Sequence, residues 1–535
     1  MTTGKWQIAI CAAIFSVLIL SQAACGGAKE AAIMVPEGAQ AGDLVGMDAC
    51  IYEVDDLEYE AECGTLIVPE NREVPGSQLI GLPIIKVLAT GTLSAEPIFW
   101  LAGGPGGTNM NFTHLDGLVD NHDIVMVGYR GVDGSVVLDC PEVTKAWRGT
   151  GGDLFSDESL RNIGESFRLC AEEWRAKGVD LDGYNLPGVV EDLEDARVAL
   201  NYPWVNLLSG SYGTRVAMFY AALYPESVYR SVMTAVNTPG HFVWEPETLD
   251  EQIEYDASLC AQDSGCSART DDLAETMRNV TDNMPDRWLF IRINPGKVRV
   301  LTHFLLYHRR SSATVYDLYL AAEEGDPSGL ALMSVMYDLI WPGMITWGEW
   351  ASKGIIDYDP NRDWVAEMDP PDSIIGSPVS LVSGGSGKFG DSWPQISVPE
   401  VFLEPPASDV ETLMVSGSID FSVAPQWATD ELLPLLPNGH QVILSEFGHT
   451  SDFWGLQPEA TVHLLTTFYD QGVVDDSHYT YQPMDFQVDW GWPTQAKQYL
   501  AIAIGGPLLL ILLIWFIVWL IRRLRARKST KQSVQ

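Results

Sequence analysis

The chain has 535 residues, too many for a single hydrophobic core, so a second domain or a large insertion is expected. Hydrophobic residues make up 46% and charged residues 19%, which excludes a disordered chain, a collagen and a small disulfide scaffold. A formal net charge of −40 would repel phosphate backbones, and this excludes a nucleic-acid partner.

The N-terminus has the pattern of an export signal. Lys5 precedes the apolar stretch Ile8–Leu20, which is short for a membrane span and suits a secretory signal peptide. Small residues then lead to Cys25, in a context similar to a bacterial lipoprotein processing site. We predict a signal peptide over residues 1–25, with Cys25 as a candidate lipidation site, and a linker over residues 26–48. An uncleaved signal anchor is the alternative.

Residues 49–236 alternate between short apolar runs and helical patterns. Pro97–Leu101, Asp123–Val127 and Val205–Leu208 are apolar runs, and Thr214–Tyr224 is a helical pattern that follows the third. Continuous apolar strands between amphipathic helices are typical of a parallel sheet that is covered on both faces. This part of the chain is therefore predicted to be the first half of an α/β core.

A serine turn lies between the third of these strands and the helix that follows it. Ser209–Gly213 has the small residues that a sharp strand-to-helix turn requires, and such a turn lifts a serine above the edge of the sheet. Ser/Gly turns are common, but the strand-turn-helix setting makes this one specific. Ser211 is therefore the predicted nucleophile.

Acyl chemistry also needs donors for the oxyanion that develops on the substrate. The backbone N–H of Tyr212, directly after the nucleophile, is one candidate. The second is expected from Gly104 in the loop Gly103–Gly107, where the absence of Cβ atoms lets the backbone approach a substrate closely. The loop lacks the G-x-G-x-x-G spacing of a dinucleotide site, so no such cofactor is expected.

The pattern changes over residues 237–398, which are helical in character and rich in tryptophan. The α/β alternation resumes over residues 399–480, at Thr412–Val415 and Gln441–Leu444. A mainly helical cap of about 160 residues, inserted into one sheet, explains both the length of the chain and this change.

The second half of the core supplies a candidate acid and a candidate base. Asp420 follows the strand at Thr412–Val415, and His449 follows the strand at Gln441–Leu444. Because the carboxyl ends of parallel strands meet at one edge of a sheet, both side chains should reach Ser211. The predicted catalytic triad is therefore Ser211, Asp420 and His449, in which the aspartate orients the imidazole and the histidine moves the proton.

The C-terminus has the pattern of a membrane anchor. Leu500–Ile521 contains no charged residue, and its length is enough to cross the ~30 Å hydrocarbon core of a bilayer. Basic residues without acids follow it and indicate the cytoplasmic side. We predict a juxtamembrane linker over residues 481–498, a transmembrane helix over residues 499–521 and a basic cytoplasmic tail over residues 522–535. The body would then lie outside the cytoplasm, at a bacterial cell surface or in the periplasm.

Six cysteines lie beyond the signal region, and in an exported domain they predict three disulfides. Proximity in the sequence favours Cys50–Cys63, Cys140–Cys170 and Cys260–Cys266, although fifteen connectivities are possible. No cysteine spacing resembles a paired CxxC site and the nine histidines are scattered, so no metal is expected.

Taken together, these motifs resemble those of exported α/β-hydrolases, and among them the proline iminopeptidase and tripeptidyl aminopeptidase-like family. The matching segments are Ala102–Gly107, Arg130-Gly131, Ser209–Thr214, Gly417 with Asp420, and Gly448-His449. The resemblance implies an α/β-hydrolase fold with an inserted cap, a Ser-Asp-His triad and no cofactor. It also implies a peptide substrate that loses residues or short peptides from its N-terminus. Two positions depart from the family pattern: Ala102 replaces a frequent histidine, and Gly128 replaces the usual acid.

Three functions remain open from the sequence. An aminopeptidase would need a carboxylate for the substrate's α-ammonium group, and the candidates at the start of the cap are Glu245, Glu247, Glu251 and Glu254. In so acidic a chain, each of them could equally be a solvated residue on a helix face. A carboxylesterase or lipase-like enzyme would use the same triad on a small ester. A non-catalytic binding protein on the same scaffold is the third possibility, and the complete triad argues against it.

Overall fold

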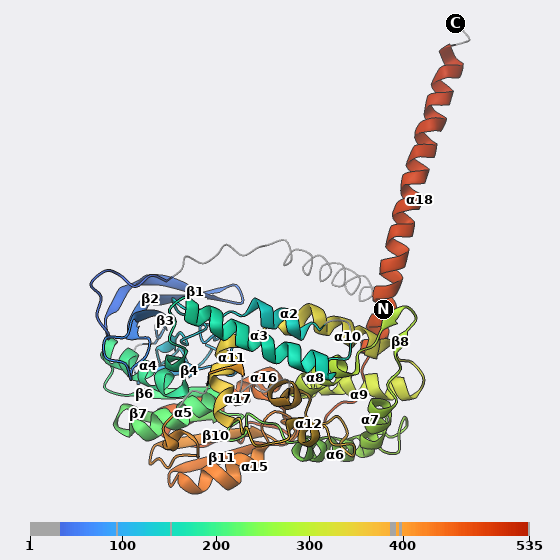
Figure 1. Cartoon of the computed structure of the whole chain (residues 1–535). Coiled ribbons are helices and arrows are strands. Elements are labelled where there is room, and N and C mark those ends of the chain that lie inside the picture. The colour runs from blue at the N-terminus through green and yellow to red at the C-terminus, as the bar shows by residue number, and fades with distance from the viewer. Residues whose placement is uncertain (1–32, 92–94, 150–151, 386–391, 395–397, 533–535) are drawn as a thin grey trace.

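In the computed structural model the chain forms a body from which one long helix extends (Figure 1). The structure describes residues 33–91, 95–149, 152–385, 392–394 and 398–532. The predicted signal peptide and Cys25 lie outside the described residues.

Within the described residues, a nine-stranded sheet forms the centre of the body, in the order β1-β2-β3-β5-β4-β6-β7-β10-β11. The strands are β1 (Leu44–Val54), β2 (Leu57–Pro69), β3 (Leu79–Val87), β4 (Ile98–Leu101), β5 (Ile124–Val127), β6 (Val205–Gly210), β7 (Val228–Thr234), β10 (Glu411–Gly417) and β11 (Gly439–Leu444). The first three strands are antiparallel to their neighbours, and those from β5 to β11 run parallel. This arrangement confirms the predicted α/β-hydrolase fold class.

Helices cover both faces of the sheet. The covering helices outside the cap are α2 (Pro141–Trp147), α3 (Asp157–Ala176), α4 (Leu186–Ala199), α5 (Tyr212–Leu223), α15 (Pro425–Trp427), α16 (Thr450–Leu456) and α17 (Pro458–Gln471). Leu207 lies in the same core as α4 and α5, whereas its neighbour Leu208 lies in the core with α17. Because side chains alternate across a strand, this double coverage explains why the strands are continuous apolar runs.

Between β7 and β10 the chain leaves the sheet and forms a mainly helical insertion, the cap. Its elements are α6 (Pro246–Gln262), α7 (Leu273–Asp282), β8 (Arg287–Trp288), β9 (Ile291–Arg292), α8 (Pro295–Leu305), α9 (Arg309–Glu323), α10 (Ser328–Ile340), α11 (Trp347–Gly354), α12 (Trp364–Met368) and α13 (Pro378–Ser380). Aromatic packing joins the cap to the core: Trp347 of α11 stacks on Trp147 of α2 with ring centroids 4.6 Å apart. Both indoles are fully buried, so the cap and core share one interior.

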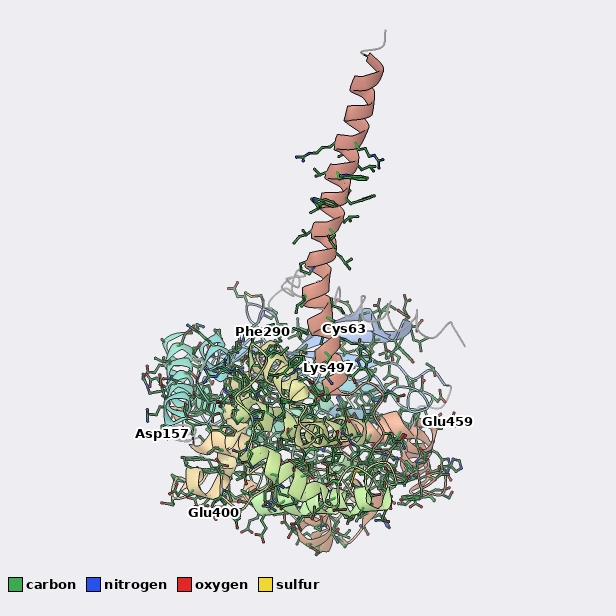
Figure 2. All side chains as sticks on the ribbon, turned by 90° about the vertical axis from the view of Figure 1, so that its right-hand side faces the viewer. Cys63, Asp157, Phe290, Glu400, Glu459 and Lys497 are labelled. Atoms are coloured by element: carbon green, nitrogen blue, oxygen red, sulfur yellow. A yellow bond between two sulfur atoms is a disulfide. The ribbon has the colours of Figure 1, made fainter. Side chains whose placement is uncertain are left out.

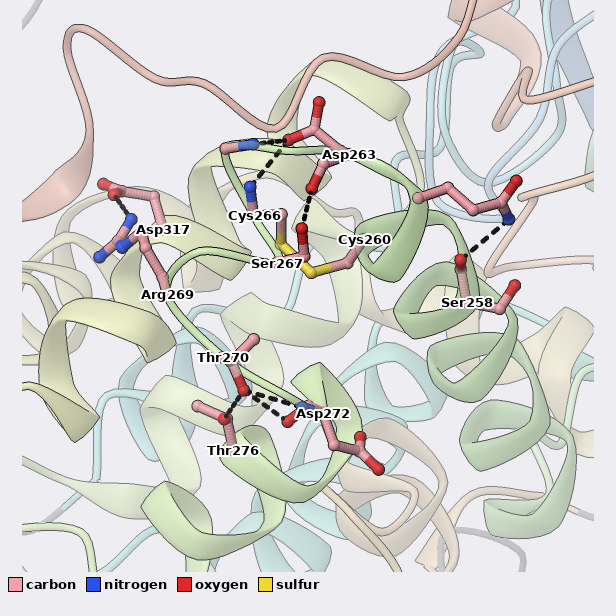
Figure 3. Close-up of a disulfide and its surroundings, with 12 residues drawn as sticks. Ser258, Cys260, Asp263, Cys266, Ser267, Arg269, Thr270, Asp272, Thr276 and Asp317 are labelled. Atoms are coloured by element: carbon pink, nitrogen blue, oxygen red, sulfur yellow. Dashed lines mark hydrogen bonds and ion pairs between the residues drawn. A yellow bond between two sulfur atoms is a disulfide. The ribbon is translucent and has the colours of Figure 1, made fainter.

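Three disulfides reinforce the body. They join Cys50 to Cys63, Cys140 to Cys170 and Cys260 to Cys266, with Cα–Cα distances of 5.9, 5.6 and 5.2 Å. Figure 3 shows the third, which closes the loop that follows α6. In that loop the Asp263 carboxylate accepts hydrogen bonds from the backbone N–H groups of Gly265 and Cys266, at 2.9 and 2.8 Å. The bridge and these bonds together fix the turn at the end of the first cap helix.

The helix that leaves the body is α18 (Trp492–Gln532). Among the described residues it is the one continuous helix long and apolar enough to cross a membrane. Its base is tied to the cap, because Lys497 forms an ion pair of 2.5 Å with Asp326 and the Ser328 hydroxyl donates to the Pro493 carbonyl at 3.4 Å.

Two elements begin inside segments that were expected to be linkers. β1 begins at Leu44, within residues 26–48, and α18 begins at Trp492, within residues 481–498. β1 is a half-exposed edge strand, and the first turns of α18 carry polar residues that contact the cap. Long apolar runs in the sequence do not indicate where β1 and α18 begin, because tertiary contacts rather than continuous hydrophobicity hold these residues in place.

Candidate active site

The predicted nucleophile lies on the turn between β6 and α5. Ser211 has φ 54° and ψ −127°, in a region that favours glycine. Its backbone N–H donates to the Thr234 carbonyl of β7 at 2.9 Å, which holds the strained turn against the sheet. Gly213 has no room for a side chain, since a Cβ there would lie 2.1 Å from the Leu101 carbonyl oxygen. These contacts explain the small residues of the motif, because α5 starts directly against the carboxyl end of β4.

The predicted acid and base meet above the ends of β10 and β11. Asp420 Oδ2 lies 2.8 Å from His449 Nδ1, and Oδ1 lies 3.0 Å from the same nitrogen. Both side chains are buried, and the backbone N–H groups of Ser422 and Val423 also donate to Asp420 Oδ1, at 2.9 and 3.1 Å. The carboxylate is therefore fixed from several sides and orients the imidazole, whose Nε2 remains for a proton donor in the cavity.

A close approach of two loops brings this pair together. A Cβ at Gly417 would lie 2.1 Å from the Phe447 carbonyl oxygen, so only glycine fits at this point. The Ile419 N–H donates to the same carbonyl at 3.0 Å. The loop after β10 is thus joined to the loop after β11 by backbone contacts, which fix the positions of Asp420 and His449 relative to each other.

Ser211 and His449 line one cavity of about 340 Å³. Gly104 and Tyr212, the predicted oxyanion donors, line the same cavity. The glycine loop lies against the nucleophile, because a Cβ at Gly103 would be 2.8 Å from the Ser211 Cβ. The structure therefore brings the predicted catalytic and oxyanion residues to one place, although more than 200 residues separate the serine from the acid and the base.

Two buried side chains that the sequence analysis did not identify hold the glycine loop. The Asn109 side chain accepts from the Ala102 N–H at 2.7 Å and donates to the Trp100 and Val127 carbonyls at 3.0 and 2.8 Å. Asn109 therefore fixes the start of the loop to the ends of β4 and β5. The second side chain is Glu349 of the cap, which accepts a hydrogen bond from the Gly106 N–H.

Glu349 lies in a charged contact that is fully enclosed. Its carboxylate is 3.2 Å from the Lys353 ammonium, and the two side chains are 2% and 1% exposed. Burial raises the pKa of the Glu349 carboxyl and lowers the pKa of the Lys353 amine, and each partner opposes this effect on the other. In the sequence a Glu and a Lys four residues apart resemble an ordinary exposed helix pair, so only the docking of α11 reveals their position.

Apolar and aromatic side chains form most of the cavity wall. They include Phe242, Trp244, Phe304, Tyr307, Trp341, Met344, Ile345, Trp350 and Val379. The polar residues of the lining are Asn237, Ser422 and Thr450, beside the glycine loop and the catalytic groups. Within the described part of the chain, no aspartate or glutamate lines this cavity.

None of the four glutamates predicted to bind the substrate's amine lines this cavity. Glu245 forms an ion pair with Arg362, at 2.6 and 2.9 Å, and the structure places it outside the cavity lining. Glu247, Glu251 and Glu254 are exposed along α6 and also lie outside it. No residue of α6 lines the cavity, which the sequence could not show because the position of the helix depends on how the cap docks.

The comparisons with known proteins are consistent with this site. No family model matches the chain. It is 26% identical over 284 residues to a tripeptidyl aminopeptidase of Streptomyces lividans, a match that covers 50% of this chain and 52% of that protein. It is 26% identical over 231 residues to the serine protease Hip1 of Mycobacterium tuberculosis, covering 39% and 44%. The matched region thus spans about half the length of these relatives, or less.

Solved structures give a weaker likeness. A serine hydrolase of Cycloclasticus zankles has a TM-score of 0.34 and 13% identity, covering 77% of this chain and 100% of that one. An esterase of Thermogutta terrifontis has a TM-score of 0.34 and 13% identity, covering 76% and 98%. The strand order and the serine turn of this chain identify its fold independently of these overlays.

Proposed function

We propose that this chain is a serine hydrolase that acts on peptides, releasing short peptides from their N-termini through an acyl-enzyme on Ser211. The observation that carries the proposal is the cavity that Ser211 and His449 both line, with Asp420 hydrogen-bonded to Nδ1 of the imidazole. The tripeptidyl aminopeptidase and serine protease relatives support a peptide rather than another acyl substrate.

The residues have distinct roles in the proposed reaction. His449 takes the Ser211 proton while the oxygen attacks the scissile carbonyl, and Asp420 stabilises the imidazolium that forms. The backbone N–H groups of Tyr212 and Gly104 receive the oxyanion of the tetrahedral intermediate. His449 then gives the proton to the leaving amine, and a water molecule, activated by the same histidine, releases the acyl group.

The cavity wall favours a released fragment longer than one residue. An α-ammonium group next to Ser211 would meet apolar walls with no carboxylate among the described lining residues, and burying an unpaired charge is strongly unfavourable. In an extended tripeptide the amine lies roughly 10 Å from the scissile carbonyl, where it can leave the apolar part of the cavity. The residue before the cleaved bond would then be apolar.

An ester substrate is the second candidate, and the same apolar lining supports it. A small apolar acyl group needs no countercharge, and the same triad would hydrolyse it. The rate of a peptidase should depend on the number of residues in its substrate, whereas that of an esterase should not. Substrates of different length therefore distinguish the two functions.

We further propose that α18 anchors the body in a membrane, with the catalytic body outside the cytoplasm. The length and apolar composition of the helix support a span, and the basic residues beyond it support a cytoplasmic C-terminus.

The test begins with a fluorophosphonate probe on the detergent-solubilised chain and on Ser211→Ala. Labelling of the native chain alone is expected; equal labelling of both would reject Ser211 as the nucleophile. Aminoacyl, dipeptidyl and tripeptidyl arylamides with the same apolar residue before the cleaved bond are then compared with a short acyl ester. The tripeptidyl substrate should give the highest kcat/KM. N-acetylation of the aminoacyl substrate should raise its kcat/KM, because it removes the charge that the apolar cavity disfavours. Turnover of the ester alone would reject the peptidase activity and support the esterase activity.

A further inference from the structure

A small hairpin of the cap lies beside the base of α18. β8 and β9 pair at Arg287 with Arg292 and at Trp288 with Ile291, which leaves a loop of two residues. That loop is Leu289 and Phe290, which are 59% and 74% exposed. Figure 2 shows Phe290 on the face of the body from which α18 leaves, near Lys497 at the base of the helix.

The composition of this loop is unusual. Two-residue hairpin loops normally contain asparagine, aspartate or glycine, because one or both positions need a positive φ. Here Leu289 has φ 53°, a conformation that a bulky residue rarely adopts. The chain thus retains two large apolar side chains in a strained and exposed turn, where a polar turn would fold more easily. Strain of this kind often accompanies a function that needs the side chains.

The hairpin faces the part of α18 that begins the apolar run. A cavity of about 380 Å³ lies between them, lined by Phe290 and Ile291 from the hairpin and by Leu500, Ala503 and Ile504 from the helix. The hairpin therefore lies level with the first turns of the predicted span, not with the polar residues before it.

The length of the apolar run fixes the depth of this contact. Residues 500–521 form about 33 Å of helix at 1.5 Å per residue, and the hydrocarbon core of a bilayer is about 30 Å thick. Only about 3 Å of the run can remain outside the core, and a tilt leaves less. The hairpin shares its cavity with both Leu500 and Ile504, which are roughly 6 Å apart along the axis. It is therefore level with the boundary between headgroups and hydrocarbon.

Helix α10 extends the same apolar surface. Val335 lines the cavity beside α18, and Leu339 and Ile340 are 67% and 44% exposed further along the helix. Figure 1 shows α10 along the face of the body from which α18 leaves. Two exposed arginines, Arg287 and Arg292, flank the hairpin loop in a chain that has more than twice as many acids as bases. Arginines in such a position can reach lipid phosphates while the apolar residues insert.

We propose that Leu289, Phe290 and the exposed side of α10 form a second membrane contact, which seats the body on the leaflet that α18 enters. The occupant of this surface is the lipid bilayer itself. The inference rests on the proposed membrane anchoring by α18. It also has a consequence for the proposed activity: Met344, which follows α10 and is 63% exposed, lines the catalytic cavity, so one rim of that cavity lies at the lipid surface.

The test uses the full chain in phosphatidylcholine–phosphatidylglycerol vesicles that contain a lipid with a quencher near the headgroup. Cys11 and Cys25 are changed to serine, and a single fluorescent label is placed through Phe290→Cys. Leu513→Cys, in the middle of α18, reports the span itself, and Glu400→Cys is the solvent control, because Figure 2 shows Glu400 at the opposite end of the body. Labelling by the fluorophosphonate probe verifies that each variant is folded.

We expect the label at position 290 to be quenched at least about twofold more than the label at position 400, as for a residue inserted at the interface. Quenching at 290 equal to that at 400, in vesicles where a deep quencher reaches position 513, overturns the membrane contact and leaves the anchor intact. A label at 513 that no lipid quencher reaches rejects the anchor, and the contact with it.

A second variant tests the role of the hairpin without a label on it. With the label at Leu339→Cys, the double substitution Leu289→Ser/Phe290→Ser should reduce headgroup quenching by about half or more, because the body loses its apolar insertion. The matched control is Val401→Ser/Leu403→Ser, two exposed apolar residues 48% and 46% accessible near Glu400. Equal quenching in both double variants would reject the hairpin as the contact.

Discussion

The carboxylate of Glu349 accepts a hydrogen bond from the backbone N–H of Gly106, and this bond joins cap helix α11 to the glycine loop beside Ser211. A second backbone bond runs next to it, from the Thr346 N–H to the Gly106 carbonyl at 3.0 Å. The loop that is expected to bind the oxyanion is therefore held on one side by the core, through Asn109, and on the other side by the cap. The cap thus contributes to the proposed catalytic geometry as well as to the wall of the cavity.

Glu349→Leu should lower both stability and activity. The free energy of unfolding should fall by about 3–5 kcal/mol, since Lys353 would remain buried without its partner. The double variant Glu349→Leu/Lys353→Met removes both charges and should recover most of that stability. It should still show a kcat at least about tenfold below the native value, because the Gly106 N–H loses its acceptor and, among the described hydrogen bonds, only the one from Thr346 then joins this side of the loop to the cap.

Thermal unfolding and steady-state kinetics on the best arylamide check this prediction. Glu173→Leu/Lys177→Met is the matched control, because it removes an exposed pair with the same spacing and a distance of 2.8 Å. That control should change stability by less than about 1 kcal/mol and leave kcat unchanged. If the kcat of the Glu349→Leu/Lys353→Met variant recovered together with its stability, Glu349 would have only a structural role.

Asp420→Asn should reduce kcat by about 10⁴-fold while the fold persists. The amide can replace the carboxylate sterically and can still accept hydrogen bonds from the Ser422 and Val423 backbone. It would, however, favour the wrong tautomer of His449 and could not stabilise the imidazolium. Asp409→Asn, an exposed acid before β10, is the control and should keep the native rate. A small effect of Asp420→Asn, equal to that of the control, would point to another acid.

Replacing Ser211 with glycine should make the fold more stable, because the serine backbone is strained. At φ 54° and ψ −127° a serine is strained, whereas a glycine is not. Ser211→Gly should therefore raise the free energy of unfolding by about 1 kcal/mol, after allowance for the greater flexibility of glycine in the unfolded chain. Ser211→Ala removes the same hydroxyl but keeps the Cβ, so its stability should stay near the native value. A higher Tm for glycine than for alanine, with neither variant labelled by fluorophosphonate, is the expected result.

The sequence predicted those parts of the site that depend on local patterns. Ser211, Asp420 and His449 lie one, three and five residues after the ends of β6, β10 and β11, so the parallel sheet brings them to one edge. Glu349 could not be identified in this way, because its role depends on how α11 docks against a loop that is 243 residues away in the sequence. The hairpin of β8 and β9 was missed for a related reason: two strands of two residues each are too short for any periodicity.

A buried acid of the cap makes stability depend on pH. Asp256 on α6 is enclosed, and burial, together with the negative charge of Glu446, raises the pKa of its carboxyl from 3.8 to about 7, although the Tyr316 hydroxyl and Gln252 donate to it. The folded state therefore binds a proton that the unfolded state releases near pH 4. The stability from this group is complete below about pH 4 and is lost as the pH rises toward 7, by up to about 1.4 kcal/mol per pH unit.

Asp256→Asn should remove this dependence, since the amide stays neutral and can still accept the Tyr316 hydrogen bond. The variant should have a Tm close to that of the native chain at about pH 4 and a higher Tm at about pH 8, with the difference growing up to about pH 7. Asp263→Asn is a useful control: it also lies at the end of α6, but its carboxylate caps backbone N–H groups of an exposed loop. Its Tm difference from the native chain should not grow in favour of the variant over the same range. A constant difference for Asp256→Asn would mean that the carboxyl titrates in the same way in the folded and unfolded states, and that burial in the cap does not hold it neutral.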